Sequence, residues 1–306
     1  MKKIIISLVG VLLAAAVAVA AEPHPLSIGF AQDTLANDWR LAQAEGLRAA
    51  LAGQPGVSLT ITDGHGDTAR QVRDIEDLIY RKVDVLIASP RDGLAMTPVL
   101  SAAQRGGTPV ILLTRLINGT DYTSFIAPDD AAIARSAARY MAAQLKGKGN
   151  ILMLQGVPTA TTAIARTEAF QAELKQHPGI RISASKVGNY LRADAIRAVE
   201  EVIQQGVPFD AIYAQSDSMA AGARIALRKA GRHPGQLLIV GIDYIAEARE
   251  AIRRGEQSAS FTYPTCAAEA AAVALAIGRG EQVPKRVVVD SVMVTRDNVE
   301  RIQPIF

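Results

Sequence analysis

Cysteine, histidine and aromatic residues are scarce in this 306-residue sequence. The single cysteine, Cys266, cannot form a disulfide within the chain, and it lies in an apolar helical pattern with no histidine near it in sequence. This pattern favours a small buried side chain over a nucleophile. The four histidines are scattered without metal-site spacing, and no G-x-S-x-G motif is present. We therefore expect no metal, no cofactor and no hydrolytic triad.

Neither sign of charge dominates the sequence. Lysine and arginine number 33 against 30 acidic residues, a formal charge of +3 that falls to +1 without Lys2 and Lys3. So small a net charge gives no reason to expect a polyanionic partner. We expect no nucleic-acid binding.

One long hydrophobic run is present, at the N-terminus. The two lysines precede a continuous apolar stretch that ends in small residues, Ala18-Val19-Ala20, which is the pattern of a secretory signal peptide cleaved after Ala20 or Ala21. The alternative is an uncleaved anchor, but the apolar run is only marginally long enough to cross a bilayer. We predict a cleaved signal peptide over residues 1–20 and a mature chain exported to the periplasm.

After this leader the sequence alternates short apolar strands with amphipathic helices, the pattern of parallel sheets covered on both faces. Helices are predicted over residues 38–51, 68–80, 94–105, 130–145, 161–177, 192–205, 217–231, 245–254 and 265–278. Two consecutive sets of about four strand-helix units favour two similar α/β lobes. The last helix and a strand over residues 286–294 are left to be shared between those lobes.

Polar side chains follow the predicted strands at their carboxyl ends, where ligands bind in open α/β sheets. The stretch over residues 209–231 is typical: a strand ends in Gln215, Ser216 and Asp217, and a helix follows. We expect Ser216 to contact a ligand and Asp217 to cap the helix. Amides, hydroxyls, charged groups and rings together suit sugars, whose hydroxyls both donate and accept hydrogen bonds and whose C–H faces pack on aromatic rings.

Two aromatic residues take comparable places in the two halves of the chain. Trp39 follows the first strand, beside Asn37 and Arg40, and Tyr190 follows a strand of the second half. Rings from opposite lobes could sandwich a sugar, with lobe packing as the alternative for Trp39.

A relaxed G-x-G-x-x-A spacing, Gly64, Gly66 and Ala69, follows the second strand rather than the first. No acidic residue ends the next strand, where a dinucleotide site would bind ribose. We interpret these glycines as turn residues, with Asp67 or Thr68 capping the next helix. The pair Asp129-Asp130 is interpreted in the same way, as the acidic start of a helix.

Several stretches, in this order, resemble the periplasmic sugar-binding proteins of ABC importers, of the ribose- and galactofuranose-binding type. They are IGFAQ with NDWR, ITDG with QVRDIEDLI, VILLTR, IAPDD, LQG with AIARTEAF, YAQSDSMAAGARIALRKAG and IVGID. The resemblance spans about residues 25–300. It implies the periplasmic binding protein type I fold, two Rossmann-like lobes with parallel sheets joined by a three-segment hinge. The N-terminal lobe would comprise residues 24–127 plus 263–289. The C-terminal lobe would comprise residues 128–262 plus 290–306, with a final strand and helix. Relatives of the lac repressor share this fold but carry a helix-turn-helix where this chain has its leader.

The resemblance also implies ligand-binding residues. Arg115 and Arg166 stand where the family's two arginines bind ring hydroxyls, Asp243 matches the carboxylate of its G-F-D pattern, and Trp39 and Tyr190 match its stacking rings. The family's usual Asp is replaced by Thr114, two usual Asn by Ser89 and Ser216, and a hinge Gln by Tyr263. The predicted binding residues are Asn37, Trp39, Arg40, Ser89, Arg115, Arg166, Tyr190, Ser216, Asp243 and Tyr263.

The expected function is therefore that of a monomeric receptor for a monosaccharide, a pentose or hexose in pyranose or furanose form, or for a related polyol. It would deliver this ligand to an inner-membrane ABC permease. A sensor presenting ligand to a chemoreceptor or sensor kinase is one alternative, and an exported carbohydrate-active α/β enzyme is another. Arg40, Arg115 and Arg166 leave an acidic sugar open.

Overall fold

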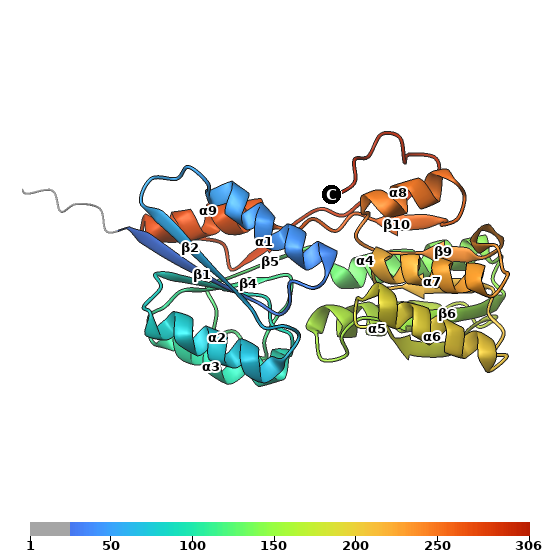
Figure 1. The fold of residues 1–306 in the computed structure, drawn as a ribbon, viewed down its shortest axis with the longest axis horizontal. Helices are drawn as coiled ribbons and strands as arrows, with labels where there is room; N and C mark the ends of the chain where they lie inside the picture. Colours follow the sequence, from blue (N-terminus) through green and yellow to red (C-terminus); the bar gives the residue numbers. More distant parts are fainter. Residues whose placement is uncertain (1–24) are drawn as a thin grey trace, which may run out of the picture.

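The computed structural model describes residues 25–306, so the predicted signal peptide lies outside the described residues. Two six-stranded sheets lie side by side along the molecule, each covered by helices on both faces (Figure 1). Within residues 25–306 no helix has both the length and the apolar character needed to span a membrane.

The first sheet is wholly parallel, in the order β11-β5-β4-β3-β1-β2. Its strands are β1 (Leu26–Gln32), β2 (Val57–Asp63), β3 (Val85–Ala88), β4 (Val110–Leu113), β5 (Ser124–Ala127) and β11 (Arg286–Val288). Helices α1 (Asp38–Leu51) and α9 (Ala267–Gly278) cover one face, and α2 (Thr68–Tyr80) and α3 (Gly93–Arg105) cover the other (Figure 1). Every residue of β3, β4 and β5 is buried, which is why these strands are continuous apolar runs in the sequence.

The second sheet has the order β12-β10-β9-β8-β6-β7 and is parallel except for β12, which runs antiparallel to β10. Its strands are β6 (Gly149–Gln155), β7 (Ile180–Val187), β8 (Ala211–Ala214), β9 (Leu238–Val240), β10 (Ala259–Phe261) and β12 (Met293–Thr295). Helices α4 (Asp130–Gln144) and α5 (Thr161–Leu174) pack together against one core, and α6 (Arg192–Gln204) and α7 (Asp217–Lys229) against the other. Helix α8 (Ala246–Arg253) lies beside α7, and a short 3-10 helix (Pro234–Gln236) precedes β9.

The chain passes between the two sheets three times, at residues 128–129, 262–266 and 289–292. The prediction of a single strand over residues 286–294 is wrong, because the last crossing divides this segment. Its two ends belong to different sheets, so β11 and β12 are separated by the crossing. The implied final helix is also absent, because turns follow β12 over residues 296–302. That the crossings bound two rigid lobes, residues 24–127 plus 263–289 and the remainder, stays a prediction.

At the starts of helices, the predicted caps of α2 and α4 agree with the structure, whereas the predicted position of Cys266 does not. Asp67 and Asp129 cap α2 and α4, each accepting a hydrogen bond from the backbone three residues on, as predicted. Cys266, in contrast, precedes α9 in the left-handed conformation, with φ of 58°, instead of lying inside the helix. It is buried, and burial raises the pKa of its thiol above the ordinary value.

Candidate functional site

A cavity of about 290 Å³ lies between the two sheets, where segments that follow strands of both sheets converge. This volume is at the lower end of the range for small-molecule sites, roughly 300–1,000 Å³. Nine predicted binding residues line it: Asn37, Trp39, Arg40, Arg115, Arg166, Tyr190, Ser216, Asp243 and Tyr263. Ser89 does not line the cavity. It is fully buried behind it and accepts a hydrogen bond from Nη1 of Arg40 at 2.6 Å.

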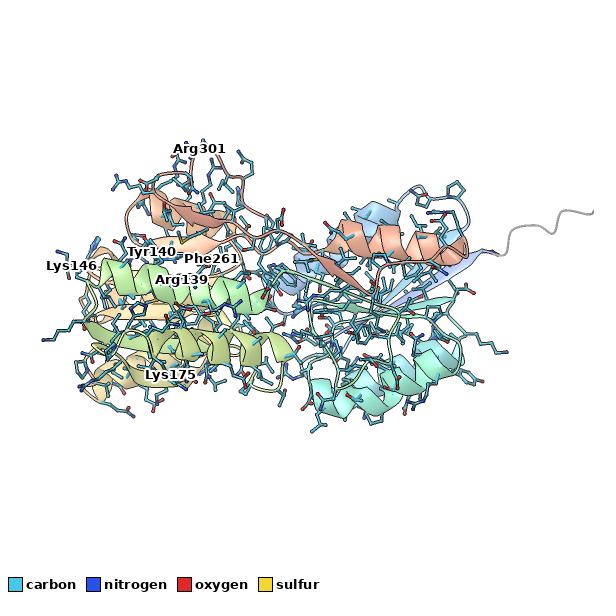
Figure 2. The ribbon with its side chains drawn as sticks, turned by 180° about the vertical axis from the view of Figure 1, so that it is seen from behind. Arg139, Tyr140, Lys146, Lys175, Phe261 and Arg301 are labelled. Atoms are coloured by element: carbon cyan, nitrogen blue, oxygen red, sulfur yellow. The ribbon has the colours of Figure 1, made fainter. Side chains whose placement is uncertain are left out.

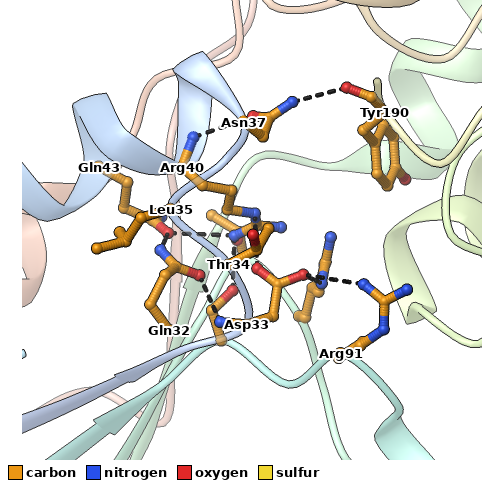
Figure 3. Close-up of polar contacts among 12 residues, drawn as sticks. Gln32, Asp33, Thr34, Leu35, Asn37, Arg40, Gln43, Arg91 and Tyr190 are labelled. Carbon is orange, nitrogen blue, oxygen red and sulfur yellow. Dashed lines mark hydrogen bonds and ion pairs between the residues drawn. The ribbon is translucent and has the colours of Figure 1, made fainter. Parts of the chain in front are cut away.

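Asp33, directly after β1, is the centre of the charged network on the first-sheet side (Figure 3). Its Oδ2 accepts a hydrogen bond from Nη1 of Arg115 at 2.8 Å and lies 3.9 Å from Nη1 of Arg91. Its Oδ1 lies 3.4 Å from Nε of Arg40. Burial alone would raise the pKa of Asp33, but the guanidiniums of Arg115 and Arg40 hold it below its ordinary value. One carboxylate therefore faces three arginines.

Arg40 is held in the same network mainly by neutral groups. Its Nη1 donates to Gln43 Oε1 at 3.1 Å, Ser89 Oγ at 2.6 Å and Thr114 Oγ1 at 3.3 Å. Burial, and then the like charge of Arg115, lower the pKa of Arg40 to about 10, so it remains a cation at neutral pH.

Arg166 of α5 is the corresponding cation on the second-sheet side, and it has its own carboxylate. Its Nε donates to Oδ1 of Asp130 at 2.8 Å, and its Nη1 donates to the carbonyl of Gln215. The Tyr263 hydroxyl donates to the other oxygen of Asp130 at 3.2 Å, and its ring centroid lies 4.5 Å from the guanidinium. Burial lowers the pKa of Arg166, but Asp130 together with the acidic groups of Tyr190, Tyr263 and Asp243 raises it above the ordinary value.

Asp243, after β9, is the least supported of the buried carboxylates that line the cavity. The residue is 6% exposed, its carboxyl has a hydrogen bond from the backbone of Asp217 and none from another side chain of the described residues, and its own N–H donates to Phe261 O at 2.9 Å. Burial raises its pKa well above the ordinary value. These properties leave the carboxyl available to a hydroxyl-bearing ligand.

Asp217 has a different role from the predicted helix cap. Ser216 caps α7 by accepting from Met219 N at 3.3 Å, and it also lines the cavity. The Asp217 carboxylate instead accepts hydrogen bonds from Tyr244 N at 2.7 Å, Gln257 Nε2 at 2.7 Å and Ser260 Oγ at 2.5 Å. It thus fixes the loop that carries the neighbouring Asp243.

Left-handed backbone conformations concentrate at the cavity. Five non-glycine residues that line it have positive φ: His65 (49°), Thr114 (63°), Asn189 (52°), Tyr190 (62°) and Asp243 (117°). This conformation is costly for residues with a Cβ, above all for a β-branched threonine. Such strain is typical of sites where side-chain direction is fixed by function.

Hydrogen bonds join the two sides of the cleft directly, so the structure is in a closed arrangement. Asn37 Nδ2 donates to Tyr190 O at 2.7 Å, and Thr162 Oγ1 donates to Thr114 O at 2.9 Å. Leu116 N donates to Thr161 Oγ1 at 2.9 Å. Each of these bonds pairs a residue next to one sheet with a residue next to the other.

The two predicted aromatic residues lie on opposite sides of the cavity. Trp39 Nε1 donates to the Tyr263 carbonyl at 2.9 Å, and the two ring centroids are 5.6 Å apart. The Tyr190 ring lies against Gly156 so closely that a Cβ there would be 1.9 Å from its Cζ. Trp39 therefore packs at a crossing and also lines the cavity, and its stacking on a ligand stays a prediction.

The set of residues predicted from the sequence omitted four ionisable residues of the site. Asp33, Arg91 and His65 line the cavity, and Asp130 holds Arg166. Asp33 and Arg91 follow strands, as the predicted residues do, so the same signal could have found them. Asp130 was hidden by its place in the first turn of α4, where an acidic residue is ordinary.

Two further hollows lie away from the cleft. One lies beside the crossings on the face seen in Figure 2, where Arg139 and Tyr140 of α4 and Phe261 of β10 line it. The other lies between α2 and α3 and is lined largely by apolar side chains. Across residues 25–306, no group of three or more His, Cys, Asp or Glu could hold a metal ion.

Comparison with known proteins gives consistent matches. The family described as periplasmic binding protein domain matches residues 28–282. The galactofuranose-binding protein of Escherichia coli strain K12 is 29% identical over 256 residues, covering 81% of this chain and 80% of that protein. The xylitol-binding protein of Mycolicibacterium smegmatis is 30% identical over 247 residues, covering 80% and 70%. A solved structure, the fructose-binding periplasmic domain of a hybrid two-component system, superimposes with a TM-score of 0.86 at 31% identity, covering 90% of this chain and 92% of that domain. The predicted resemblance and α/β fold class are thus confirmed.

Proposed function

The chain belongs to the periplasmic binding protein family, and from this premise we propose that it binds a monosaccharide or related polyol in the cavity between its sheets. It then presents this ligand to an ABC permease in the inner membrane. The N-terminal pattern of residues 1–20 is consistent with export to the periplasm through a cleaved signal peptide. The names of the relatives that bind galactofuranose and xylitol support this class of ligand.

One observation carries the proposal: residues that line the closed cavity from both sides have buried polar atoms without a hydrogen bond within the described chain. Nε of Arg115, Oδ1 of Asp33 and the Tyr190 hydroxyl are buried without a hydrogen bond. Buried polar groups are destabilising until they are paired. A small molecule with several hydroxyls can pair them all, because each hydroxyl both donates and accepts.

The proposed residue roles follow from these positions. Arg115 and Arg166 donate hydrogen bonds to ligand oxygens from opposite sides of the cavity. The carboxyl of Asp243 accepts hydrogen bonds from adjacent hydroxyls of the ligand. Tyr190, Trp39 and Tyr263 supply flat surfaces for C–H groups. Asn37, Arg40 and Ser216 complete the polar lining, while Ser89 acts indirectly by holding Arg40.

The proposed mechanism is hinge closure. In an open form, water solvates the groups on each lobe and the ligand can enter. Contacts to both lobes at once then favour the closed form, because the ligand stabilises closure only through interactions that one lobe alone cannot provide. The permease would recognise this closed form. The mechanism includes no chemical change of the ligand.

Calorimetry on the mature chain, after a thermal-shift screen of pentoses, hexoses, polyols and sugar acids, tests the proposal. We expect at least one compound to raise the melting temperature and to bind with 1:1 stoichiometry. Failure of every compound to bind a correctly folded chain would overturn the proposal. Recovery of each bound compound unchanged after long incubation distinguishes a receptor from a carbohydrate-active enzyme.

A sensory role is the second candidate, favoured by one comparison. The fructose-binding domain that superimposes on this chain is part of a hybrid two-component system. A receptor that serves a chemoreceptor or sensor kinase would use the same cavity and the same closure. Deletion of the gene would then abolish the transcriptional or motile response to the ligand while leaving its uptake intact, whereas a transport role predicts loss of uptake.

A further inference from the structure

Resting on the proposed function, we infer that the ligand of this cavity is an anionic sugar derivative, a sugar or polyol that carries one carboxylate. The inference comes from the balance of fixed charge in the closed cavity. Its carboxylate would face the arginines on the first-sheet side, and its hydroxyls would face Asp243.

Cations outnumber anions around the cavity. Four guanidiniums line it, those of Arg40, Arg91, Arg115 and Arg166, against the carboxyls of Asp33 and Asp243. Asp130, directly behind Arg166, adds a third carboxyl. Four cations against at most three anions leave at least one positive charge uncompensated. His65 also lines the cavity, with its Nδ1 3.0 Å from Oδ2 of Asp63, but Asp63 itself does not line the cavity.

The excess charge is localised on one side. Arg166 is paired with Asp130 in a 2.8 Å ion pair, so the second-sheet side is balanced before Asp243 is counted. On the first-sheet side, Arg40, Arg91 and Arg115 share only Asp33. Arg115 lines the cavity and is 1% exposed, and its Nε is a buried donor without a hydrogen-bond partner in the described chain.

Closure makes this imbalance costly for a neutral ligand. In an open cleft, water would solvate the three guanidiniums, but in the closed cleft Arg40 and Arg115 are buried and Arg91 is only partly exposed. A buried charge without a counter-charge opposes any conformation that traps it. A monoanionic ligand supplies the missing charge and accepts the planar, paired hydrogen bonds that guanidiniums form with carboxylates. Such a ligand therefore favours closure more than its neutral analogue does.

Calorimetry with matched pairs of compounds tests the inference on the mature chain. Suitable pairs are galacturonate with galactose, glucuronate with glucose, gluconate with glucitol and ribonate with ribitol. We expect the acid of at least one pair to bind about tenfold or more tightly than its neutral partner. Neutral partners that bind as tightly as their acids would overturn the inference while leaving the proposed function intact. If no member binds but another neutral pentose, hexose or polyol of the screen does, the inference alone is overturned, whereas failure of the whole screen overturns both.

Thr114 offers a variant that changes only the charge of the cavity. Its Oγ1 lies 3.3 Å from Nη1 of Arg40, and its φ of 63° suits aspartate and asparagine better than threonine. We expect Thr114→Asp to reduce the acid preference about tenfold relative to Thr114→Asn, which has the same shape without the charge. An unchanged preference would show that the carboxylate does not bind beside these arginines and would overturn the assignment.

Arg91 provides a second test should the Thr114 variants fold poorly. Its side chain is 23% exposed, so Arg91→Gln removes a charge from the lining with little effect on packing. The ratio of the dissociation constants of the neutral compound and its acid should fall severalfold. A ratio equal to that of the parent chain would count against a contribution of this cluster to anion binding.

Discussion

Asn37, the residue before α1, donates a hydrogen bond to the backbone carbonyl of Tyr190 on the opposite side of the cleft, with 2.7 Å between Nδ2 and the oxygen (Figure 3). Its Oδ1 accepts from Arg40 N at 3.1 Å and so caps α1. One side chain therefore stabilises a helix through one atom and the closed cleft through the other.

These two roles of Asn37 can be separated by substitution. Asn37→Ser keeps a cap but loses the bond to Tyr190, whereas Asn37→Ala loses both. We expect both variants to bind ligand about fivefold more weakly, since one interlobe hydrogen bond is worth about 1 kcal/mol. Only the alanine variant should also lose about 1 kcal/mol of unfolding free energy in urea. Full affinity in the serine variant would show that this bond does not favour closure.

Asp243 should matter for binding and not for folding. Within the described chain its carboxyl accepts a hydrogen bond only from the backbone of Asp217, and burial disfavours its charged form. We expect Asp243→Asn to weaken ligand binding by about 1.5 kcal/mol or more, without lowering the melting temperature. Asp130→Asn is the matched control, because it breaks the buried pair with Arg166 and should cost roughly 3 kcal/mol of stability. Equal falls in melting temperature in the two variants, together with unchanged ligand affinity in Asp243→Asn, would contradict these roles.

Asp217 should make stability depend on pH. Burial raises its pKa from the ordinary 3.8 to about 6, although hydrogen bonds from Ser260 and Gln257 lower the pKa in part. The folded chain thus binds the proton more tightly than the unfolded chain, and the unfolding free energy falls as pH rises from about 4 to about 6. This contribution is roughly 3 kcal/mol. Urea unfolding at about pH 4.5 and pH 7 should show a smaller fall in Asp217→Asn, and parallel profiles would refute the assignment.

Much of the fold could be predicted from the sequence because its signals are local. The predicted bounds of α1 and α2 agree with the structure, since their caps Asn37 and Asp67 and their apolar periodicity lie within a few residues. The division of residues 286–294 between two sheets could not be derived from the pattern alone. Asp290 and Ser291 interrupt the apolar run, but two polar residues do not show that its halves pair in different sheets, which depends on β5 and β10, distant in sequence.

Several residues that line the site could be predicted from the sequence, but the hydrogen bonds that hold them in place could not. The position after a strand identified Arg115 and Asp243, and the structure brings both to one cavity. Nothing in the sequence indicated that the Asp217 carboxylate would fix the loop that carries Asp243. That role depends on hydrogen bonds from Tyr244 and Ser260, which belong to other segments of the chain. Interactions between residues far apart in the chain leave no periodic signal in the sequence.

Gly156 leaves the space that the Tyr190 ring occupies. A Cβ at this position would be 1.9 Å from Cζ of that ring, so Gly156→Ala must displace it from the cavity wall. We expect a loss of about 1–3 kcal/mol in stability from overpacking, together with weaker ligand binding. In a Tyr190→Ala background the same substitution should cost almost nothing, which a double-mutant cycle measures. An equal loss of stability in both backgrounds would show that Gly156→Ala does not act through the Tyr190 ring.

Trp39 is the only tryptophan, so its fluorescence reports one place in the molecule. Its indole N–H donates to the Tyr263 carbonyl at a crossing, and the Arg40 guanidinium lies 4.9 Å from its ring centroid. Because closure and ligand contact both change the surroundings of this ring, we expect its emission to change on ligand addition, with a midpoint equal to the calorimetric dissociation constant. Tyr263→Phe should keep the response, because the backbone carbonyl that holds the indole remains, while the bond to Asp130 is lost. Constant emission during saturation by a ligand that calorimetry detects would mean that neither closure nor the ligand alters this crossing.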